Sequence, residues 1–216
     1  EVRIVGINHD AVEIDAQGNA TKTAGLTFMA VHSLPIAYQF NSTNTNVGGW
    51  EGSALRTSMN SGDIWNTLAT ADPKLTGAIK PVYKKTSNEG GAYVEGVSKK
   101  VNDTQDKLWI PSHKELADSI LDFWPRYAWL NDEGKQYEFF KGKVTGWLEN
   151  TILAGMDKTQ NESRPARRAD EYWWERSCTP SDTTSFLGCY CNGNPLRYVN
   201  DNHANRAYGV VLGFSL

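Results

Sequence analysis

The sequence predicts an α+β domain in which short helices flank a small twisted antiparallel sheet. Apolar runs of strand length stand near both ends of the chain, at residues 2–7 and 208–216. Apolar side chains recur at near-helical intervals between Trp50 and Leu68. A third apolar run, at residues 108–110, is followed by a helix-capping sequence. The 216 residues suffice for one domain, spanning 1–216, with a substantial core, and they contain neither an internal repeat nor an interdomain linker.

The first half of the chain alternates strand patterns with turn-rich stretches. In order, the sequence predicts strands at 2–7 and 26–31 around a turn-rich stretch at 8–19, a loop at 41–49, two short helices over 50–68, a strand at 79–84 and a glycine-rich stretch at 87–100. The two helices are separated at Asn60–Gly62, because successive Asn, Ser and Gly disfavour a continuous helix. We expect Trp50, Met59 and Trp65 in the core rather than around a cofactor.

The clearest local signals stand at residues 108–115. Leu108, Trp109 and Ile110 are typical of a compact strand, which Pro111 ends. Ser112 and Glu115 have the spacing of a capping box, which predicts a helix to about Leu121 with His113 facing solvent. Further on, the sequence predicts an aromatic-rich stretch at 123–130, a turn at 131–134, a mixed segment to about Trp147 and a polar surface loop at 150–169.

The tail, residues 172–216, has apolar edges and a polar centre. It begins with Tyr172, Trp173 and Trp174, and it closes on an apolar strand at 209–216. Trp173 and Trp174 are expected to form a buried frame together with Val210, Leu212 and Phe214. Residues 1–171 are then the scaffold that supports the tail.

The polar centre of the tail has an unusual composition. Trp, Glu, Lys, Gln and Met total 41 residues, and all of them lie at or before Arg176. An even spread would place about nine in the last forty residues, and there are none. Strands and turns disfavour Glu, Lys and Gln, but they do not exclude Trp and Met.

The polar centre is therefore the candidate binding surface. Its side chains supply adaptable hydrogen bonds and flat amphipathic contacts, as antibody loops do. The expected exposed, ligand-binding residues are Cys178, Thr179, Ser181, Asp182, Thr183, Cys189, Tyr190, Leu196, Arg197, Tyr198, Asn200, Asn202, His203 and Arg206. Among them, Tyr190, Arg197, Tyr198 and Arg206 have the types that usually dominate interface energies. In the alternative interpretation, residues 192–195 form a hairpin turn and Tyr190 and Tyr198 are cross-strand partners.

Composition argues against several function classes. A net charge of −3 gives no reason to expect nucleic acid as a partner, and the basic cluster of Arg164, Arg167 and Arg168 is typical of a solvated loop. No apolar run approaches the ~20 residues of a membrane helix, so we expect no direct membrane insertion. The chain begins at Glu1 without a signal peptide, which suggests a mature or excised domain.

The histidines and cysteines do not predict a metal or cofactor. His9 and Asp10 are typical of a turn, and His32 is typical of a structural histidine. Cys178, Cys189 and Cys191 leave at least one free thiol. Cys189 and Cys191 point to the same face of a strand and are poorly placed to bond each other, whereas Cys178 could bond either of them. Together with His203 they match no usual zinc spacing, so we expect no metal and no cofactor.

Several short sequences carry a family resemblance. They are residues 6–10 (GINHD), Gly49-Trp50 with residues 55–60 (LRTSMN), residues 107–112 (KLWIPS), Trp173-Trp174-x-Arg176-Ser177, and Gly209-Val210. The chain resembles a family of domains from gut bacterial and phage surface proteins that looks like the C-type lectins. Family members often have an apolar residue where Glu175 stands and a proline soon after Ser177. The resemblance spans nearly the whole chain.

The resemblance implies a function. Some lectin-like domains are variable proteins of diversity-generating retroelements, in which template adenines are randomised within the 3′ end of the gene. Randomised AAC codons become NNC, which cannot encode Trp, Glu, Lys, Gln or Met. These are the types missing after Arg176. Glu175 then lies at the border of the hypervariable segment, and Arg176 and Ser177 belong to its frame.

We therefore expect a C-type lectin fold with a diversified ligand-binding surface and no enzymatic activity. The expected ligand is a protein or glycan on another cell or particle, bound by a domain at a cell surface or on a phage tail. Calcium is not implied, because the triplets of calcium-dependent lectins are missing from the sequence. Two alternatives remain: an adhesion or structural module of a surface fibre, and a cysteine-dependent enzyme of the formylglycine-generating type, for which Cys189 and Cys191 are the candidates.

Overall fold

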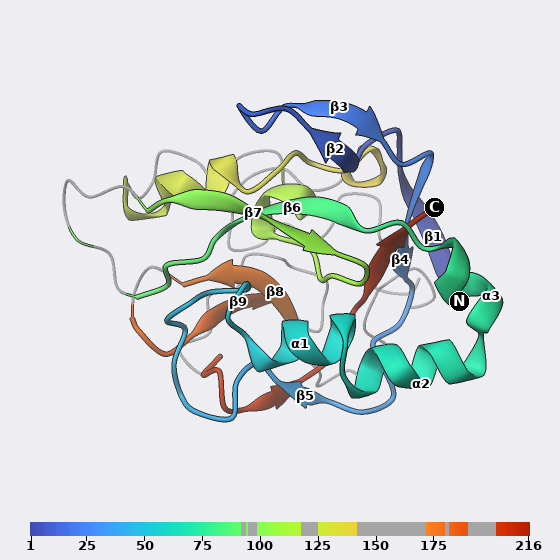
Figure 1. The fold of residues 1–216 in the computed structure, drawn as a ribbon. Coiled ribbons are helices and arrows are strands. Elements are labelled where there is room, and N and C mark those ends of the chain that lie inside the picture. The colour runs from blue at the N-terminus through green and yellow to red at the C-terminus, as the bar shows by residue number, and fades with distance from the viewer. Residues whose placement is uncertain (92–93, 95–98, 118–124, 142–171, 180–181, 190–201) are drawn as a thin grey trace.

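The computed structural model of the chain describes residues 1–91, 94, 99–117, 125–141, 172–179, 182–189 and 202–216. The elements of the first half are β1 Val2–Ile7, β2 Ala11–Ile14, β3 Ala20–Thr23, β4 Leu26–Ala30, β5 Tyr38–Gln39, α1 Ala54–Asn60, α2 Asp63–Ala71, α3 Pro73–Ala78 and β6 Val82–Ser87. Figure 1 shows α1, α2 and α3 grouped on one side of the ribbon, below the β6–β7 hairpin.

The second half contains β7 Val101–Asp106, α4 His113–Leu116, the 3-10 helices η1 Pro125–Asp132 and η2 Glu138–Phe140, and the strands β8 Trp173–Cys178, β9 Phe186–Cys189, β10 Ala207–Tyr208 and β11 Gly213–Ser215. All strand pairs between these elements are antiparallel. Short helices around small antiparallel sheets make this an α+β structure, as the sequence predicts. None of the described helices has the length and apolar character needed to cross a membrane.

The two ends of the chain meet in one sheet. β4 lies between β1 and β11, so the order is β1-β4-β11. Phe28 of β4 is opposite Phe214 of β11, and their rings stack with centroids 5.2 Å apart. In Figure 1 this sheet lies on the right and the β8–β9 pair lies on the left. The end of the tail is therefore fixed in the sheet that also contains the start of the chain.

The core joins both parts of the chain. Its aromatic centre is Phe40, which stacks on Phe186 at 3.5 Å and meets the edges of Trp50 and Trp174. Trp50, Met59, Trp174, Val210 and Phe214 are buried, as the sequence predicts, whereas Trp65 and Leu212 are half-buried against the core. Trp50 Nε1 donates to Asp106 at 2.8 Å, so its polar atom is satisfied inside the protein.

Three predictions of secondary structure need correction. Residues 8–19 include β2, which pairs with β3, because alternation over four residues suffices for an exposed hairpin. Residues 108–110 are fully buried, but there only Trp109 pairs, in a bridge with Gly213. The helix after Ser112 ends at Leu116 rather than near Leu121, because Ala117 has extended backbone angles.

Other boundaries moved by a few residues. The helices separate at Ser61–Gly62 as predicted, but a third helix, α3, follows with Asp72 as its N-cap. The strand predicted at 79–84 is β6, which runs from Val82 to Ser87. The capping box itself is confirmed: Ser112 Oγ accepts from the Glu115 amide, and Glu115 accepts from the Ser112 amide. The predictions for 150–169, including Arg164, Arg167 and Arg168, fall outside the described residues.

Candidate functional site

The tail is built around the antiparallel pair β8–β9. Trp173 lies opposite Cys189 and Trp174 opposite Gly188, and a bulge follows before Cys178 meets Phe186. The Trp174 amide donates to Gly209 O at 3.0 Å, and its indole Nε1 donates to Tyr38 O at 2.8 Å. These bonds tie β8 to β10 and β5, so the predicted frame residues Trp173 and Trp174 hold the tail to the scaffold.

Residues 202–204 return beside β9. The Phe186 amide donates to Asn202 O at 3.2 Å, the Ala204 amide donates to Thr184 O at 2.9 Å, and Ser185 forms a bridge with His203. The chain therefore leaves β9 at Cys189 and comes back alongside it at Asn202. Both anchors of the segment between them belong to the buried frame.

The expected exposure of four tail residues is wrong. Cys178, Thr179, Cys189 and Asn202 are at most 2% exposed. The polar composition of the tail centre predicts exposure, but every residue of β8 and β9 is buried, so these strands are covered on both faces. Cys178 Sγ lies 3.7 Å from Asn46 O, and Cys189 Sγ lies 3.3 Å from Glu175 Oε1.

Four other candidates reach the surface. Thr183 and Arg206 are exposed, and Asp182 and His203 are half-buried. Asp182 also shapes its turn: Oδ1 accepts from the amides of Thr184 and Ser185, each at 2.7 Å. The remaining candidates lie outside the described residues; they are Ser181, Tyr190, Leu196, Arg197, Tyr198 and Asn200, and the same holds for the hairpin alternative at 192–195.

Asn46, which the sequence pattern does not single out, joins the tail loop to the scaffold. Its Nδ2 donates to Asp182 O at 3.1 Å and to Ser185 O at 2.9 Å, and its amide donates to Thr183 O at 2.9 Å. Its Oδ1 accepts from the Gly91 amide. Asn46 is fully buried, so its bonds hold two scaffold loops against the tail. One Asn in an Asn- and Thr-rich loop gives no signal of this role.

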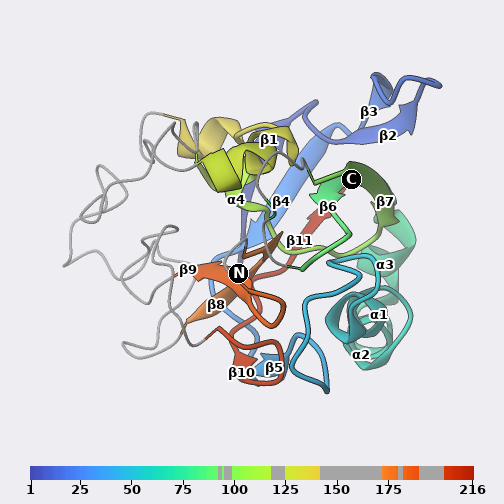
Figure 2. The ribbon, with the colours of Figure 1, turned by 90° about the vertical axis from the view of Figure 1, so that its left-hand side faces the viewer.

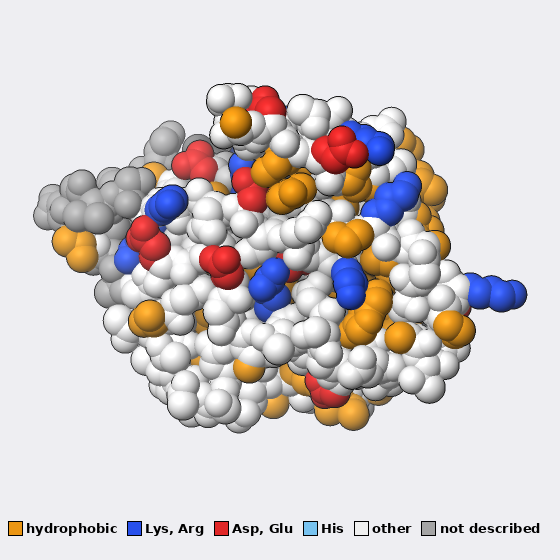
Figure 3. Space-filling model, in the orientation of Figure 1, with side chains coloured by type: hydrophobic (Ala, Val, Ile, Leu, Met, Phe, Trp, Pro, Cys, Tyr) orange, Lys and Arg blue, Asp and Glu red, His pale blue; other side chains and the backbone are white. Residues whose placement is uncertain are grey.

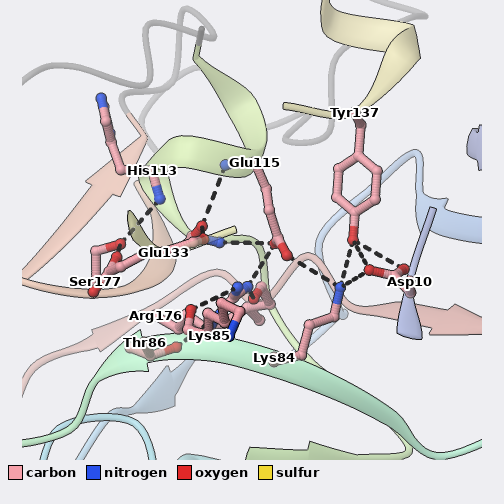
Figure 4. A network of polar contacts seen from close by, with 12 residues as sticks. Asp10, Lys84, Lys85, Thr86, His113, Glu115, Glu133, Tyr137, Arg176 and Ser177 are labelled. Atoms are coloured by element: carbon pink, nitrogen blue, oxygen red, sulfur yellow. Dashed lines mark hydrogen bonds and ion pairs between the residues drawn. The ribbon is translucent and has the colours of Figure 1, made fainter. Parts of the chain in front are cut away.

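A buried ionic group lies beneath the tail; we call it the Glu115 cluster, formed by Asp10, Lys84, Glu115, Tyr137 and Arg176. Lys84 Nζ lies 2.6 Å from Asp10 Oδ1 and 3.1 Å from Glu115 Oε1. Arg176 Nη1 lies 2.6 Å from Glu115 Oε2. Tyr137 accepts from Lys84 and donates to Asp10. Figure 4 shows the side chains converging from the loop after β1, from β6, from α4 and from β8.

The electrostatics of the Glu115 cluster are strongly coupled. Burial alone would raise the pKa of Glu115, but Arg176 and Lys84 hold that pKa below its ordinary value. Burial likewise opposes ionisation of Asp10, yet Lys84 and His9 keep its pKa well below the usual range. Arg176 is fully engaged, since it also donates to Ile110 O, Thr86 Oγ1 and Lys85 O. Asp10 is therefore an ionic anchor and not the simple turn residue that the sequence suggested.

A second buried group is the Glu133 cluster, formed by Glu133, Ser87, Ser112, Ser177 and His113. Glu133 Oε1 accepts from the Ser87 amide at 2.8 Å, and Oε2 accepts from Ser177 Oγ. Ser112 Oγ donates to Glu133 O, and the His113 amide donates to Ser177 Oγ. Burial, only partly offset by these bonds, raises the pKa of Glu133 to about 7.

The predicted solvent exposure of His113 is wrong. The side chain is 1% exposed, and Nδ1 lies 2.9 Å from Glu175 Oε2. A capping box marks the first turn of a helix, but it does not determine which face of that turn packs against β8. In His32, Nε2 lies 3.8 Å from Glu1 Oε2, and the buried Nδ1 has no hydrogen-bond partner among the described residues.

The described thiols are poorly suited to nucleophilic chemistry. Burial raises the pKa of Cys178 and of Cys189 well above the ordinary value, and nearby carboxylates raise both further. Reactive cysteines have the opposite properties, a lowered pKa and access to solvent. Both residues are free thiols, and within the described ranges no group of three His, Cys, Asp or Glu side chains could hold a metal ion. Cys191 lies outside these ranges.

The face in Figure 3 mixes charges rather than segregating them. Lysine and arginine side chains alternate with acidic ones across it. Figure 2, turned by 90°, shows the strands of the tail, β8 to β10, on the side away from α1, α2 and α3. In the described tail, Arg206 is the exposed cation and Asp182 a half-buried acid.

A family model described as a domain of unknown function, DUF6273, matches residues 27–211. That range includes β4 through β10, both buried clusters except Asp10, and the described tail surface. Neither the curated proteins nor the solved structures contain a match to the chain.

Proposed function

From the premise that the chain belongs to the DUF6273 family, we propose that it is a receptor-recognition domain whose tail carries a diversified ligand-binding surface. The proposed fold is C-type-lectin-like, and the proposed source of diversity is a retroelement that rewrites the 3′ end of the gene. The ligand is a protein or a glycan on another cell or particle. The domain is then part of a cell-surface protein or of a virion fibre.

The observation that carries the proposal is the composition break after Arg176. The five residue types that NNC codons cannot encode are missing from Ser177 to Leu216. Arg176, the last residue before the break, belongs to the Glu115 cluster and lies inside β8, which continues through Ser177 to Cys178. Beyond it the described chain alternates between buried anchors and surface segments.

The arrangement of the tail supports this function. A surface that tolerates many sequences needs a frame whose folding does not depend on it. Here the frame consists of β8, β9 and the buried anchors Cys189 and Asn202. Thr183 and Arg206 are exposed, and Asn46 holds the turn that carries Thr183 through three bonds to backbone oxygens.

The fold proposal has its own support. β1 and β11 both pair with β4, which brings the two ends of the chain into one sheet. In Figure 1 the β8–β9 pair lies to the left of this sheet, and the other sheets among the described residues are two-stranded. A C-type-lectin-like domain combines these features, with short helices around a small antiparallel sheet.

The deciding experiment is sequencing of the DNA downstream of the gene. We expect a near-copy of the segment that encodes residues 177–216, differing at adenines of the copy, together with a reverse transcriptase gene. Sister genes should differ in the codons for exposed residues such as Thr183 and Arg206 and agree in those for Trp173 and Trp174. A flank with no such copy and no reverse transcriptase gene would refute the retroelement part of the proposal.

A binding experiment tests the receptor part separately. Two natural or designed tails on one scaffold should give equal thermal stability but different binding profiles on a panel of immobilised glycans and surface proteins. Identical profiles for tails that differ at several exposed positions would refute recognition by this surface.

A further inference from the structure

Glu133 occupies an unusual electrostatic position. It is fully buried, and no lysine, arginine or histidine among the described residues forms an ion pair with it. Its carboxyl group has two donors, the Ser87 amide and the Ser177 hydroxyl. A buried carboxylate without a cation is costly, so the protonated form is favoured over the charged one.

The carboxyl group of Glu133 also joins elements that are distant in the sequence. Ser87 ends β6, and Ser177 lies in β8, one residue after Arg176. The Glu133 carbonyl accepts from Ser112, the N-cap of α4. One residue thereby connects β6, α4 and the strand that leads into the tail.

Cys178 links this junction to the tail surface. Its Sγ lies 3.8 Å from Ser87 O, the residue whose amide binds Glu133, and 3.7 Å from Asn46 O. Asn46 in turn holds the turn at Asp182 to Ser185. Loosening of the Glu133 contacts would therefore reach the tail loop through one buried thiol and one buried amide.

We propose that the Glu133 cluster is a proton-operated latch, which is closed when Glu133 is protonated and loosens the anchoring of β8 and the tail loop when Glu133 ionises. The latch is separate from the proposed diversification, because it depends only on scaffold and frame residues. It makes the rigidity of the tail frame respond to pH near neutrality.

Burial outweighs the two cationic groups that face Glu133, since Arg176 and His113 by themselves lower its pKa. α4 contributes His113, and β8 contributes Arg176 and the thiol of Cys178. The charge of Arg176 is already shared with Glu115 and with the backbone oxygens of Ile110 and Lys85. β6 contributes the neutral Ser87 amide. The net environment raises the pKa of Glu133 to about 7.

The sign of the pH effect follows from linkage. Because the pKa of Glu133 is higher in the folded protein than in the unfolded chain, the stability it contributes is complete below an unfolded pKa of 4.5 and is lost as pH rises through about 7. Each unit of pKa shift corresponds to a tenfold change in the folding equilibrium. We expect the unfolding equilibrium constant to rise by roughly a hundredfold between pH 5 and pH 8.5 through this group.

The test compares the wild-type chain with Glu133→Gln, which keeps the shape and one donor but cannot ionise. Glu138→Gln is the matched control, because Glu138 lies five positions away and its side chain is 52% exposed. Urea unfolding between pH 5 and pH 8.5 should show a decline in stability for wild type and Glu138→Gln, and a much flatter profile for Glu133→Gln. A flat wild-type profile, or the same decline in Glu133→Gln, overturns the latch.

The rate at which Cys178 is alkylated, measured by mass spectrometry, tests whether the contacts around β8 and the tail loop loosen. At pH 8.5 Cys178 should react several-fold faster in wild type than in Glu133→Gln, whereas at pH 6 the two rates should agree. Comparing the proteins at one pH cancels the intrinsic pH dependence of the thiol. A ratio that does not change with pH contradicts the proposal.

A second variant keeps the test decisive if Glu133→Gln does not fold. Ser177→Ala removes the hydroxyl that donates to the carboxylate. The charged form then loses a donor, so the stability decline should move to higher pH than in wild type. An unchanged midpoint overturns the latch. Neither result bears on the downstream DNA or the binding panel, so failure of the latch and failure of the proposed function are distinguishable.

Discussion

Glu115 and Glu133 are equally shielded from solvent, at 2% and 0% exposure, and both bond to Ser112. Glu115 lies between Lys84 and Arg176, and its pKa is lowered. Glu133 has an amide and a hydroxyl for partners, and its pKa is raised. Burial is common to both, so the partners decide the direction. The chain thus contains one buried glutamate that is more stable charged and a second, nearby one that is more stable neutral.

The largest effect is expected when the anchor loses a cation. Arg176→Met keeps much of the side-chain volume but leaves the buried carboxylate of Glu115 with one ion-pair partner, Lys84, among the described residues. Removing one partner of a buried ion pair typically costs about 3–5 kcal/mol, and Arg176 also satisfies Ile110 O and Thr86 Oγ1. Urea unfolding should register this loss. The exposed Arg206→Met is the control, expected within ~0.5 kcal/mol of wild type.

A loss below about 1 kcal/mol for Arg176→Met would contradict the anchor interpretation. It would mean that Glu115 takes up a proton or water at little cost. The distinction between the two glutamates would then disappear, since both would be buried and neutral near pH 7.

The difference between these glutamates was not readable from the sequence. Local patterns predicted the strand at 2–7, the break at Asn60–Gly62 and the capping box at Ser112, because neighbours in the chain decide those features. Lys84 and Asp10 are 74 residues apart, and Arg176 and Glu115 are 61 apart. Charged residues are ordinarily solvated, so no local rule selects the ones that meet inside.

The candidate site was predictable to a similar degree. Trp173, Trp174 and Phe214 follow a strong apolar pattern and are buried as expected. The polar composition of the tail centre predicted exposure for Cys178, Cys189 and Asn202, but β8 and β9 are covered on both faces and Asn202 is buried beside β9. β7, with the sequence VNDTQD, was missed because it lacks apolar residues after Val101 and is defined by its pairing with β6.

The second-largest effect distinguishes Glu115 from Glu133 by how the stability of the protein responds to acid. A lowered pKa means that the stability contributed by Asp10 and Glu115 is present above their unfolded values of 3.8 and 4.5, and is lost as pH falls below them. We expect unfolding free energy to fall from about pH 4.5 downward. Asp10→Asn should make that slope shallower by up to one proton, or about 1.4 kcal/mol per pH unit.

Glu133→Gln is the control for this decline of unfolding free energy at acid pH. Its group is protonated in the folded protein across that pH range, so the slope below pH 4 should match wild type. Equal acid slopes in all three proteins would show that the Glu115 cluster does not carry the acid sensitivity. A changed slope in Glu133→Gln would show that the two clusters titrate as one unit.

The smallest effect concerns residues that touch neither glutamate, and it tests why the tail lacks five residue types. Thr183→Lys and Arg206→Glu introduce types that NNC codons cannot encode at two exposed positions. Surface substitutions of this kind usually change stability by less than ~0.5 kcal/mol. We expect urea unfolding to show changes of this size in both variants, and stability to vary with pH as in wild type at acid and at alkaline pH. Folding would then not explain the missing residue types. A constraint in the coding sequence would be the stronger explanation. A loss of more than ~1 kcal/mol of unfolding free energy in both variants would instead show that the fold itself excludes these residue types. That result would remove the main support for diversification. The contrast between Glu115 and Glu133 would be unaffected.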